Sequence, residues 1–368
     1  MTKRAFRAPG RVNLIGEHTD YNLGFVLPIA LDLACVATTV PASGVHLRVR
    51  SEHRAEEKEW DLTQIPHLQP SHDWTDYVIG VAQQLIRAGY VVAPLNILLD
   101  SSVPEGSGLS SSAALEVSSA LAMLNGQPAD RLRIAQLCQS AEREFVGVPS
   151  GIMDQYVAVY GLEGAALEID CRSLTHQAVS LPPTVEIFAV NSMVKHDLAQ
   201  SAYKERTEEC AAAVVSIQAH YPQVRSLRDV DASMLAEVFD RLPATPARRA
   251  RHIVGENERV ERFAAACQSG DLRKMGDLFF ASHRSLRLDY DVSCEELDFL
   301  VESAQAIDGV YGARLTGGGF GGCTVNLVDP AADQPFQIEI VKRYRERFSI
   351  TPQVYRCQPS AGAAEVTI

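Results

Sequence analysis

The chain has 368 residues, of which 46% are hydrophobic and 22% are charged, which is the composition of a globular protein with room for two or more domains. Its formal net charge of −12 disfavours nucleic-acid binding, because an acidic surface repels phosphates. We find neither a signal peptide at the N-terminus nor an apolar run of about 18 residues, so we expect a cytoplasmic protein without a membrane span. The eight cysteines are scattered and lack C-x-x-C spacing, which argues against structural zinc and a disulfide framework.

The first ~100 residues favour short strands, because they are rich in β-branched residues and are interrupted by Gly, Pro and Ser. The charged stretch 53–61 predicts an exposed turn or an edge, and the apolar spacing over 74–90 predicts a helix. The expected strands are residues 11–15, 24–31, 34–40, 45–51 and 94–100.

The loop 16–22 (GEHTDYN) follows an apolar strand and concentrates Glu17, His18 and Asp20. A carboxylate often accepts two hydrogen bonds, which suits a polyol with adjacent hydroxyls. A metal site and a solvated acidic turn are the alternatives. Arg11, at the mouth of the same strand, is either a surface ion-pair partner or the cation that phosphoryl transfer requires.

The stretch Gly106–Glu116 (GSGLSSSAALE) places two glycines and three serines before an Ala-rich amphipathic helix that Asn125-Gly126 should end. A flexible linker is disfavoured, because polar chain would then follow. The free N–H groups of a helix start suit a phosphate, and a serine hydroxyl could bind Mg²⁺. A capped structural helix is the alternative, and the absence of a following lysine separates the stretch from the G-x-x-x-x-G-K-[ST] loop.

Two further carboxylates flank a predicted helix break at VGVPSG (146–151). Glu142 lies on the preceding amphipathic helix, where an exposed position is the ordinary alternative to a functional role. Asp154 lies near the start of the next short helix, where a carboxylate suits the helix dipole whatever its function.

The pattern of expected strands and helices changes near residue 181. We therefore divide the chain into an N-terminal α/β domain (1–180) and a C-terminal α+β domain (181–368). Residues 201–300 are mostly helical in pattern. Further on, Gly317, Gly319 and Gly322 match G-x-G-x-x-G, but the dinucleotide fingerprint requires a following helix and CTVNLV alternates as a strand does. We therefore reject dinucleotide binding and expect the turn to let backbone approach a ligand or a partner loop.

Three of these segments, in this order, resemble the small-molecule kinase family of galacto-, homoserine, mevalonate and phosphomevalonate (GHMP) kinases, and its galactokinase branch in particular. They are APGRVNLIGEHTDYN followed by GFVLP, then VPEGSGLSSSAALE, then LTGGGFGGC. The resemblance spans almost the whole chain. It implies a two-domain α+β GHMP-kinase-like fold with the active site in the cleft between the domains.

The resemblance also implies a role for each matching residue. Asp154 would be the catalytic aspartate near the sugar's anomeric hydroxyl, and Arg11 would stabilise the transferred phosphoryl group. Ser112 and Glu142 would be the magnesium ligands. The substrate-binding residues would be Glu17, His18, Asp20, Gly151 and Tyr203. The ATP-binding residues would be Gly106, Ser107, Gly108, Leu109, Ser110, Ser111 and Ser112, with Trp74 near the adenine.

The implied function is ATP-dependent phosphorylation of galactose at C1, which gives galactose 1-phosphate and ADP. A kinase for N-acetylgalactosamine or arabinose is the enzymatic alternative. A non-catalytic galactose sensor is disfavoured, because GLSSSAA is complete and Asp154 is present. We expect galactose, ATP and Mg²⁺ as ligands, a monomer, and no nucleic-acid or membrane partner.

Overall fold

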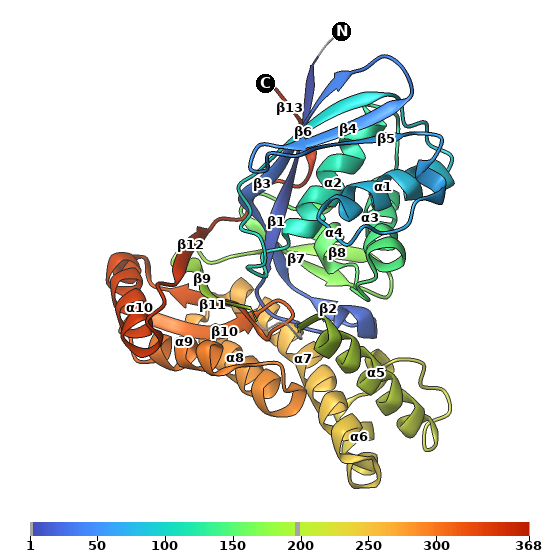
Figure 1. Cartoon of the computed structure of the whole chain (residues 1–368). Helices are drawn as coiled ribbons and strands as arrows, with labels where there is room; N and C mark the ends of the chain where they lie inside the picture. Colours follow the sequence, from blue (N-terminus) through green and yellow to red (C-terminus); the bar gives the residue numbers. More distant parts are fainter. Residues whose placement is uncertain (1–2, 196–198, 368) are drawn as a thin grey trace.

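The structure is a computed structural model that describes residues 3–195 and 199–367 (Figure 1). Its upper part is built on a six-stranded sheet with the order β13-β1-β3-β6-β4-β5. Neighbouring strands are antiparallel except β4 and β6, which are parallel. The strands are β1 (Arg4–Asn13), β3 (Pro28–Pro41), β4 (His46–Ser51), β5 (Glu57–Asp61), β6 (Leu95–Ser101) and β13 (Ala364–Val366).

Four helices complete the upper part. The helices α2 and α4 pack against β1 and β3, and α1 and α3 pack against these two helices. Asp130 caps α3 by accepting a hydrogen bond from the Arg133 amide at 3.0 Å. The last turn of α3 widens into the π-helical turn η3 (Ala141–Val146), which carries Glu142. The helices are α1 (Thr75–Arg87), α2 (Ser111–Leu124), α3 (Arg131–Ser140) and α4 (Met153–Tyr160).

The lower part contains a four-stranded antiparallel sheet with the order β10-β11-β9-β12. Contacts with α8 and α9 cover this sheet, and α10 packs against α9. A small sheet of β2, β7 and β8 lies between the two parts in Figure 1, and α5, α6 and α7 extend below it. The strands are β2 (Phe25–Val26), β7 (Ala165–Asp170), β8 (Thr175–Ser180), β9 (Glu186–Lys195), β10 (Val310–Thr316), β11 (Gly321–Val328) and β12 (Gln353–Cys357). The helices are α5 (Ala199–Gln218), α6 (Ala232–Val238), α7 (Ala244–Ser269), α8 (Leu272–Ser285), α9 (Glu295–Gln305) and α10 (Asp333–Phe348).

Short helical turns join these elements. Besides η3, two of them carry residues discussed below, namely η1 (Asp20–Asn22) and the π-helical η6 (Leu286–Tyr290). The others are η2 (Ile65–His67), η4 (Leu227–Asp229), η5 (Phe239–Arg241) and η7 (Pro330–Ala332).

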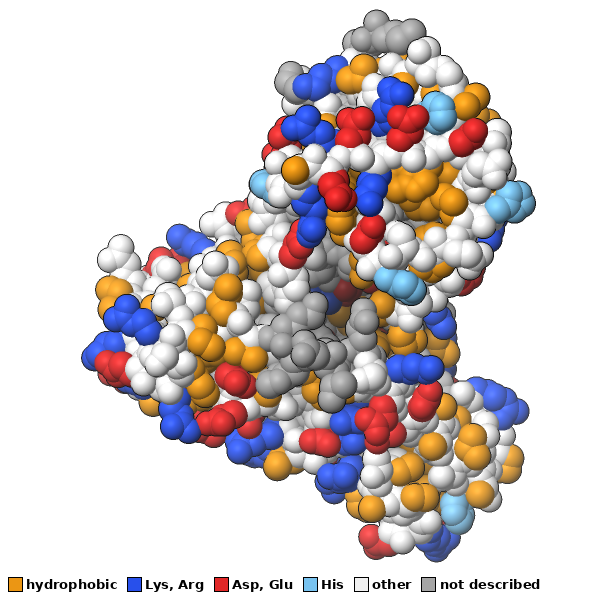
Figure 2. All heavy atoms as spheres, in the orientation of Figure 1, with side chains coloured by type: hydrophobic (Ala, Val, Ile, Leu, Met, Phe, Trp, Pro, Cys, Tyr) orange, Lys and Arg blue, Asp and Glu red, His pale blue; other side chains and the backbone are white. Residues whose placement is uncertain are grey.

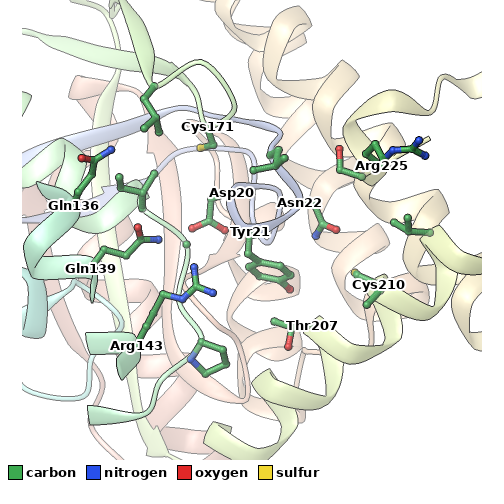
Figure 3. Close-up of a pocket in the computed structure, with 18 of the residues that line it drawn as sticks. Asp20, Tyr21, Asn22, Gln136, Gln139, Arg143, Cys171, Thr207, Cys210 and Arg225 are labelled. Carbon is green, nitrogen blue, oxygen red and sulfur yellow. The ribbon is translucent and has the colours of Figure 1, made fainter. Parts of the chain in front are cut away.

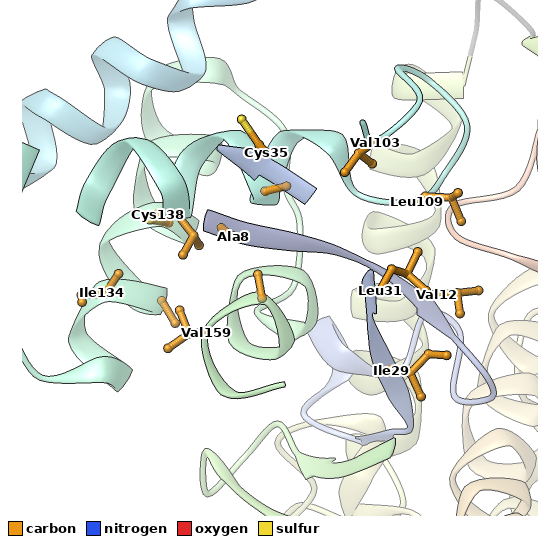
Figure 4. Packing of buried hydrophobic residues seen from close by; sticks show 14 of the residues in the cluster. Ala8, Val12, Ile29, Leu31, Cys35, Val103, Leu109, Ile134, Cys138 and Val159 are labelled. Carbon is orange, nitrogen blue, oxygen red and sulfur yellow. The ribbon is translucent and has the colours of Figure 1, made fainter. Parts of the chain in front are cut away.

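The main apolar core is continuous between the two sheets. In β1 and β3, Val12 pairs with Ile29, and both side chains are fully buried (Figure 4). The same cluster extends to Cys323 and Val325 of β11 in the lower sheet. The two parts therefore share packed apolar surface instead of meeting only through a polar interface.

The structure agrees with most of the expected elements. The helix expected over 74–90 is α1, the charged stretch 53–61 ends in the edge strand β5, and a strand follows the glycine run 317–322. The end of the chain differs from a division at residue 181, because β13 pairs with β1 in the upper sheet. Both chain ends accordingly lie at the top of Figure 1. This pairing covers an otherwise open edge of β1, which is a contact that local sequence patterns do not encode.

Two surface properties bear on possible partners. On the face shown in Figure 2, basic and acidic side chains are interspersed over both parts of the molecule. Across residues 3–195 and 199–367, no helix is both long enough and apolar enough to cross a membrane.

Candidate active site

The loop that follows β1 is fixed by residues from the lower part of the molecule. The Glu17 carboxylate, only 2% exposed, accepts hydrogen bonds from Asn13 Nδ2 (3.0 Å), Thr316 Oγ1 (3.0 Å) and the Gly317 amide (2.8 Å). Arg314 of β10 is fully buried and donates to the Leu14 carbonyl at 2.8 Å. Glu17 therefore uses most of its capacity to accept hydrogen bonds in anchoring the loop.

A cavity of about 160 Å³ opens beside this loop, between the upper and lower parts. It brings together segments that are far apart in the sequence, namely β1, the loop after it, η3, the start of α4, α5 and the glycine turn after β10. Every residue predicted to bind the sugar, both predicted catalytic residues and one predicted metal ligand border it. They are Arg11, Glu17, His18, Asp20, Glu142, Gly151, Asp154 and Tyr203.

Arg11 and Asp154 form a two-pronged ion pair at one wall of this cavity. Arg11 Nε lies 2.8 Å from Asp154 Oδ1, and Nη2 lies 2.7 Å from Oδ2. Burial would lower the pKa of Arg11, but the carboxylates of Asp154 and Glu17 outweigh burial and raise it, so the guanidinium stays charged. Arg11 also donates to the Gly108 carbonyl, and the Ser110 hydroxyl donates to Asp154. The ion pair thus joins the cavity to the loop 106–112.

Asp20 lies on another wall, where its carboxyl is buried and close to a second carboxylate. Burial, and then the charge of Asp154, raise the pKa of Asp20 to about 7. A Cβ on Gly151 would lie 1.9 Å from Asp20 Oδ2, so only glycine fits there. Asp20 and Gly151 also border a larger groove of about 650 Å³ towards α3 and α5 (Figure 3).

His18 is a neutral hydrogen-bonding group in this cavity. Burial first, and then the charges of His252 and Arg206, lower the pKa of His18 to about 3. Its Nδ1 lies 2.9 Å from the Tyr21 hydroxyl, and its ring centroid lies 5.4 Å from that of Tyr203. At neutral pH the ring therefore carries one N–H and one acceptor nitrogen.

The loop 106–112 leads directly into α2, as expected for a phosphate-binding turn. Ser110 adopts the left-handed conformation (φ 58°), and the first turn of α2 follows from Ser111. A Cβ on Gly322 would lie 3.1 Å from the Ser107 carbonyl, so the glycine run after β10 packs against this loop. The prediction that this run lets backbone approach a partner loop is confirmed. Ser107 and Leu109 have no exposed surface, so they shape the loop and do not face a cavity.

A second cavity, of about 510 Å³, lies on the other side of the loop. It is bordered by Gly106, Ser111 and Ser112 of the loop and by Trp74 at the start of α1. The Arg54 guanidinium lies 5.8 Å from the centre of the Trp74 ring. A cavity of this size, with an indole ring in its wall and a helix N-terminus beside it, can take a flat aromatic group attached to phosphates.

Comparisons with known proteins agree with this geometry. Residues 2–40 match the galactokinase galactose-binding signature, residues 76–162 the GHMP kinases N terminal domain, and residues 263–346 the GHMP kinases C terminal family. A galactokinase of Roseiflexus sp. (strain RS-1) is 45% identical over 365 residues, which cover 98% of this chain and 92% of the relative. A galactokinase of Homo sapiens is 43% identical and covers 98% of this chain and 91% of its own length.

The chain belongs to the galactokinase family.

A crystal structure of Lactococcus lactis galactokinase complexed with galactose has a TM-score of 0.95 to this galactokinase-family chain. The sequences are 34% identical, and the match covers 99% of this chain and 95% of the other. Methanococcus jannaschii mevalonate kinase, at 16% identity and a TM-score of 0.69, shares the fold alone. These matches confirm the expected two-domain GHMP fold.

The residues near Ser112 fit a divalent cation in this galactokinase-family site. Glu142 is buried, and burial raises its pKa, while hydrogen bonds from Ser150, Gln155 and Ser112 oppose that rise. Glu116 is fully buried one turn along α2, and its Oε1 has no hydrogen-bond partner among the described residues. Buried carboxylates of this kind suit a hard cation. Among the described residues, no group of three or more His, Cys, Asp or Glu side chains is placed to hold a metal ion.

The sequence did not single out several residues that build the galactokinase-family site. Gln155 donates from Nε2 to both Glu116 and Glu142, at 2.9 Å each. Arg314 and Thr316 hold Glu17 of the loop 16–22 from 297 and 299 positions away in the sequence. We call this loop the sugar loop below, because Glu17, His18 and Asp20, which are predicted to bind the sugar, lie on it. A signal was present for Arg314 alone, since it is a charged residue within the apolar strand before the glycine run.

Proposed function

We propose that this galactokinase-family chain transfers the γ-phosphoryl group of ATP to the C1 hydroxyl of galactose and releases galactose 1-phosphate and ADP. The observation that carries the proposal is the Arg11–Asp154 ion pair, which lies between the sugar-sized cavity and the phosphate-type loop. A phosphoryl acceptor and a phosphoryl donor placed in these two spaces would meet at that pair.

We place the nucleotide at the N-terminal end of α2. The helix N-terminus and the loop 106–112 receive the phosphates, and the cavity beside Trp74 receives the adenine. Ser112 and Glu142 would hold Mg²⁺, which neutralises phosphate charge when it is bound. The burial of Glu142 fits this assignment, because a bound cation would offset the cost of burying its charge.

The sugar occupies the 160 Å³ cavity. Asp20 accepts hydrogen bonds from hydroxyls, and His18 and Tyr203 supply further polar contacts. Glu17 and Gly151 shape the wall, Glu17 as an anchor of the loop and Gly151 as the close neighbour of Asp20. Several polar groups in a small buried space can read several hydroxyls at once.

The reaction needs an oriented hydroxyl and positive charge more than covalent chemistry by the protein. Asp154 orients the C1 hydroxyl and accepts its proton while the new O–P bond forms and the bond to the ADP oxygen breaks. Arg11, held beside Asp154, stabilises the charge on the phosphoryl group in the transition state of the transfer. The Ser110 hydroxyl keeps one Asp154 oxygen in place through the hydrogen bond described above.

The test is ADP release measured across a panel of sugars, with the phosphate located on the product by NMR. We expect galactose to be used at C1, with glucose poorer by at least ~10²-fold, because the wrong C4 epimer leaves a buried polar group unpaired. If N-acetylgalactosamine or arabinose is used in preference to galactose, that sugar is the substrate. Galactose binding without ADP release would indicate a sensor.

A matched variant tests the catalytic assignment. Asp154→Asn keeps the side-chain volume and removes the charge, so turnover should fall by at least the ~10²-fold typical of a lost general base. Galactose binding measured by calorimetry should be largely kept. Turnover within a few-fold of the parent enzyme would remove Asp154 from the proposed mechanism.

We further propose that the enzyme works in the cytoplasm as a monomer. All eight cysteine side chains are free thiols, which supports a reducing compartment.

A further inference from the structure

His18 is the first member of a chain of buried hydrogen-bonding side chains that leads away from the sugar cavity. The Tyr21 hydroxyl lies 2.9 Å from His18 Nδ1 and 2.6 Å from the Tyr290 hydroxyl, which in turn lies 3.1 Å from Cys210 Sγ. Tyr21 and Cys210 face each other across the groove between η1 and α5 (Figure 3). The chain therefore links the sugar loop to α5 and to η6 of the lower part.

Each member of this chain holds one transferable proton near neutral pH. Burial raises the pKa of Tyr21 and of Tyr290 well above the ordinary value and raises that of Cys210 to about 11. The imidazole of His18 is neutral, as described above. The proton on His18 can therefore sit on Nδ1 or on Nε2, and the chain decides which.

The three hydrogen bonds of this chain can run in either of two directions, and in each direction every bond is donated by a different group. In the first, Cys210 donates to Tyr290, Tyr290 donates to Tyr21, and the Tyr21 hydroxyl donates to His18 Nδ1. In the second, every bond is reversed, and the Tyr290 hydroxyl must donate to the Cys210 sulfur. The first arrangement joins a phenol to an imidazole nitrogen, whereas the second ends on a thiol sulfur, which is a weak acceptor.

We propose that Tyr21, oriented by Tyr290 and Cys210, is a positioning residue that holds His18 as the Nε2–H tautomer, so that His18 donates a hydrogen bond to one hydroxyl oxygen of the sugar. His18 Nε2 is buried and has no hydrogen-bond partner among the described residues, while His18 borders the sugar cavity. Asp20 can only accept when it is ionised. Together the two residues recognise a pair of sugar hydroxyls, one that accepts a hydrogen bond from His18 and one that donates to Asp20. This role rests on the proposed sugar site.

The primary test is ¹⁵N NMR of the histidine rings in the full-length protein without sugar or nucleotide. The Nδ1 and Nε2 chemical shifts report the tautomer, and the His18 signals are assigned by their loss in His18→Gln. We expect the Nε2–H tautomer in the parent protein. The Nδ1–H tautomer there would overturn the proposal, whatever the substrate proves to be.

The second test is Tyr21→Phe, which removes only the hydroxyl. We expect the Nε2–H preference to weaken and the KM for galactose to rise roughly tenfold, with the KM for ATP within about twofold of the parent value. Tyr311→Phe is the matched control, because the Tyr311 hydroxyl bonds to Asp329 at 2.8 Å and does not border the sugar cavity. An unchanged tautomer signal together with an unchanged galactose KM in Tyr21→Phe would overturn the proposal. Because the tautomer is read in the free protein, the tautomer part of this result is independent of whether galactose is the substrate.

Discussion

Asp20 shows how one buried carboxyl couples the stability of the fold to pH. Its pKa is about 7 in the folded protein and 3.8 in an ordinary setting, so folding favours the protonated form. Below about pH 4 the group is neutral in both states and contributes nothing. As the pH rises from about 4 to 7, the unfolded state gives up the proton first and the folded state loses stability, and above 7 this loss is complete.

Asp20→Asn should therefore stabilise the protein in a pH-dependent way. We expect the free energy of unfolding to rise by roughly 1–4 kcal/mol at pH 8 and by much less at pH 5. Urea unfolding at the two pH values measures this, with the exposed Asp32→Asn as the control. An equal effect at both pH values would mean that Asp20 ionises like a surface carboxyl.

The proposed magnesium ligands give a second prediction for single residues. Ser112→Ala and Glu142→Gln each remove an oxygen ligand that a hard cation prefers, so the Mg²⁺ concentration for half-maximal activity should rise at least ~10-fold. Ser118→Ala on the same helix is the control, because its hydroxyl bonds to the Leu115 carbonyl within α2. Parent-like Mg²⁺ dependence in both variants would remove these residues as ligands.

At the scale of elements, β10 fixes the sugar loop through one fully buried guanidinium. Arg314 Nη1 lies 2.8 Å from the Leu14 carbonyl and 3.5 Å from Glu17 Oε1, and Nε lies 3.2 Å from Ser282 Oγ. Arg314→Met keeps much of the volume and removes these donors. Because it removes one of the two cations near the buried Glu17, we expect the unfolding free energy to fall by about 3–5 kcal/mol.

Arg314→Met should change the kinetics through its effect on the sugar loop. If Arg314→Met folds, the KM for galactose should rise more than the KM for ATP, because Glu17 and the neighbouring His18 lose their support. Denaturant unfolding and steady-state kinetics measure the two effects, with the exposed Arg273→Met of α8 as the control. A stable variant with an ordinary galactose KM would show that β10 is not needed to hold the loop.

The same elements show what the sequence predicts and what it does not. The apolar periods of α1 and the strands, the Asn125 stop of α2 and the glycine–serine order before that helix are local, and the structure agrees with each. The contact of Arg314 with Glu17 joins positions about 300 residues apart, and the chain from His18 to Tyr290 joins η1 to η6. Such contacts depend on how the sheets pack, and no local period encodes them.

For the whole molecule, the C-terminal tail ties the end of the chain to its beginning. β13 pairs with β1 through Ala5 and Val366, and Arg4 bonds to Glu365 at 2.7 Å through two nitrogens. Ser360 lies beside Leu31 of β3, so the tail also covers the neighbouring strand. The upper sheet is therefore completed only when the last part of the chain has been made.

Removal of residues 359–368 should expose the edge of β1. We expect a loss of about 1–3 kcal/mol in the free energy of unfolding, and a tendency to associate, because an open edge strand offers unpaired N–H and C=O groups to a second chain. The sugar cavity lies away from this edge, since its lining comes from residues 11–20, 142–154, 203 and 317–318, so galactose KM should change little. Light scattering and thermal unfolding compare the shortened chain with the full one and with Glu365→Gln, which removes the charge of the ion pair with Arg4 and keeps β13 in place. A shortened chain that stays monomeric with the stability of the full chain would show that β13 is dispensable to the sheet.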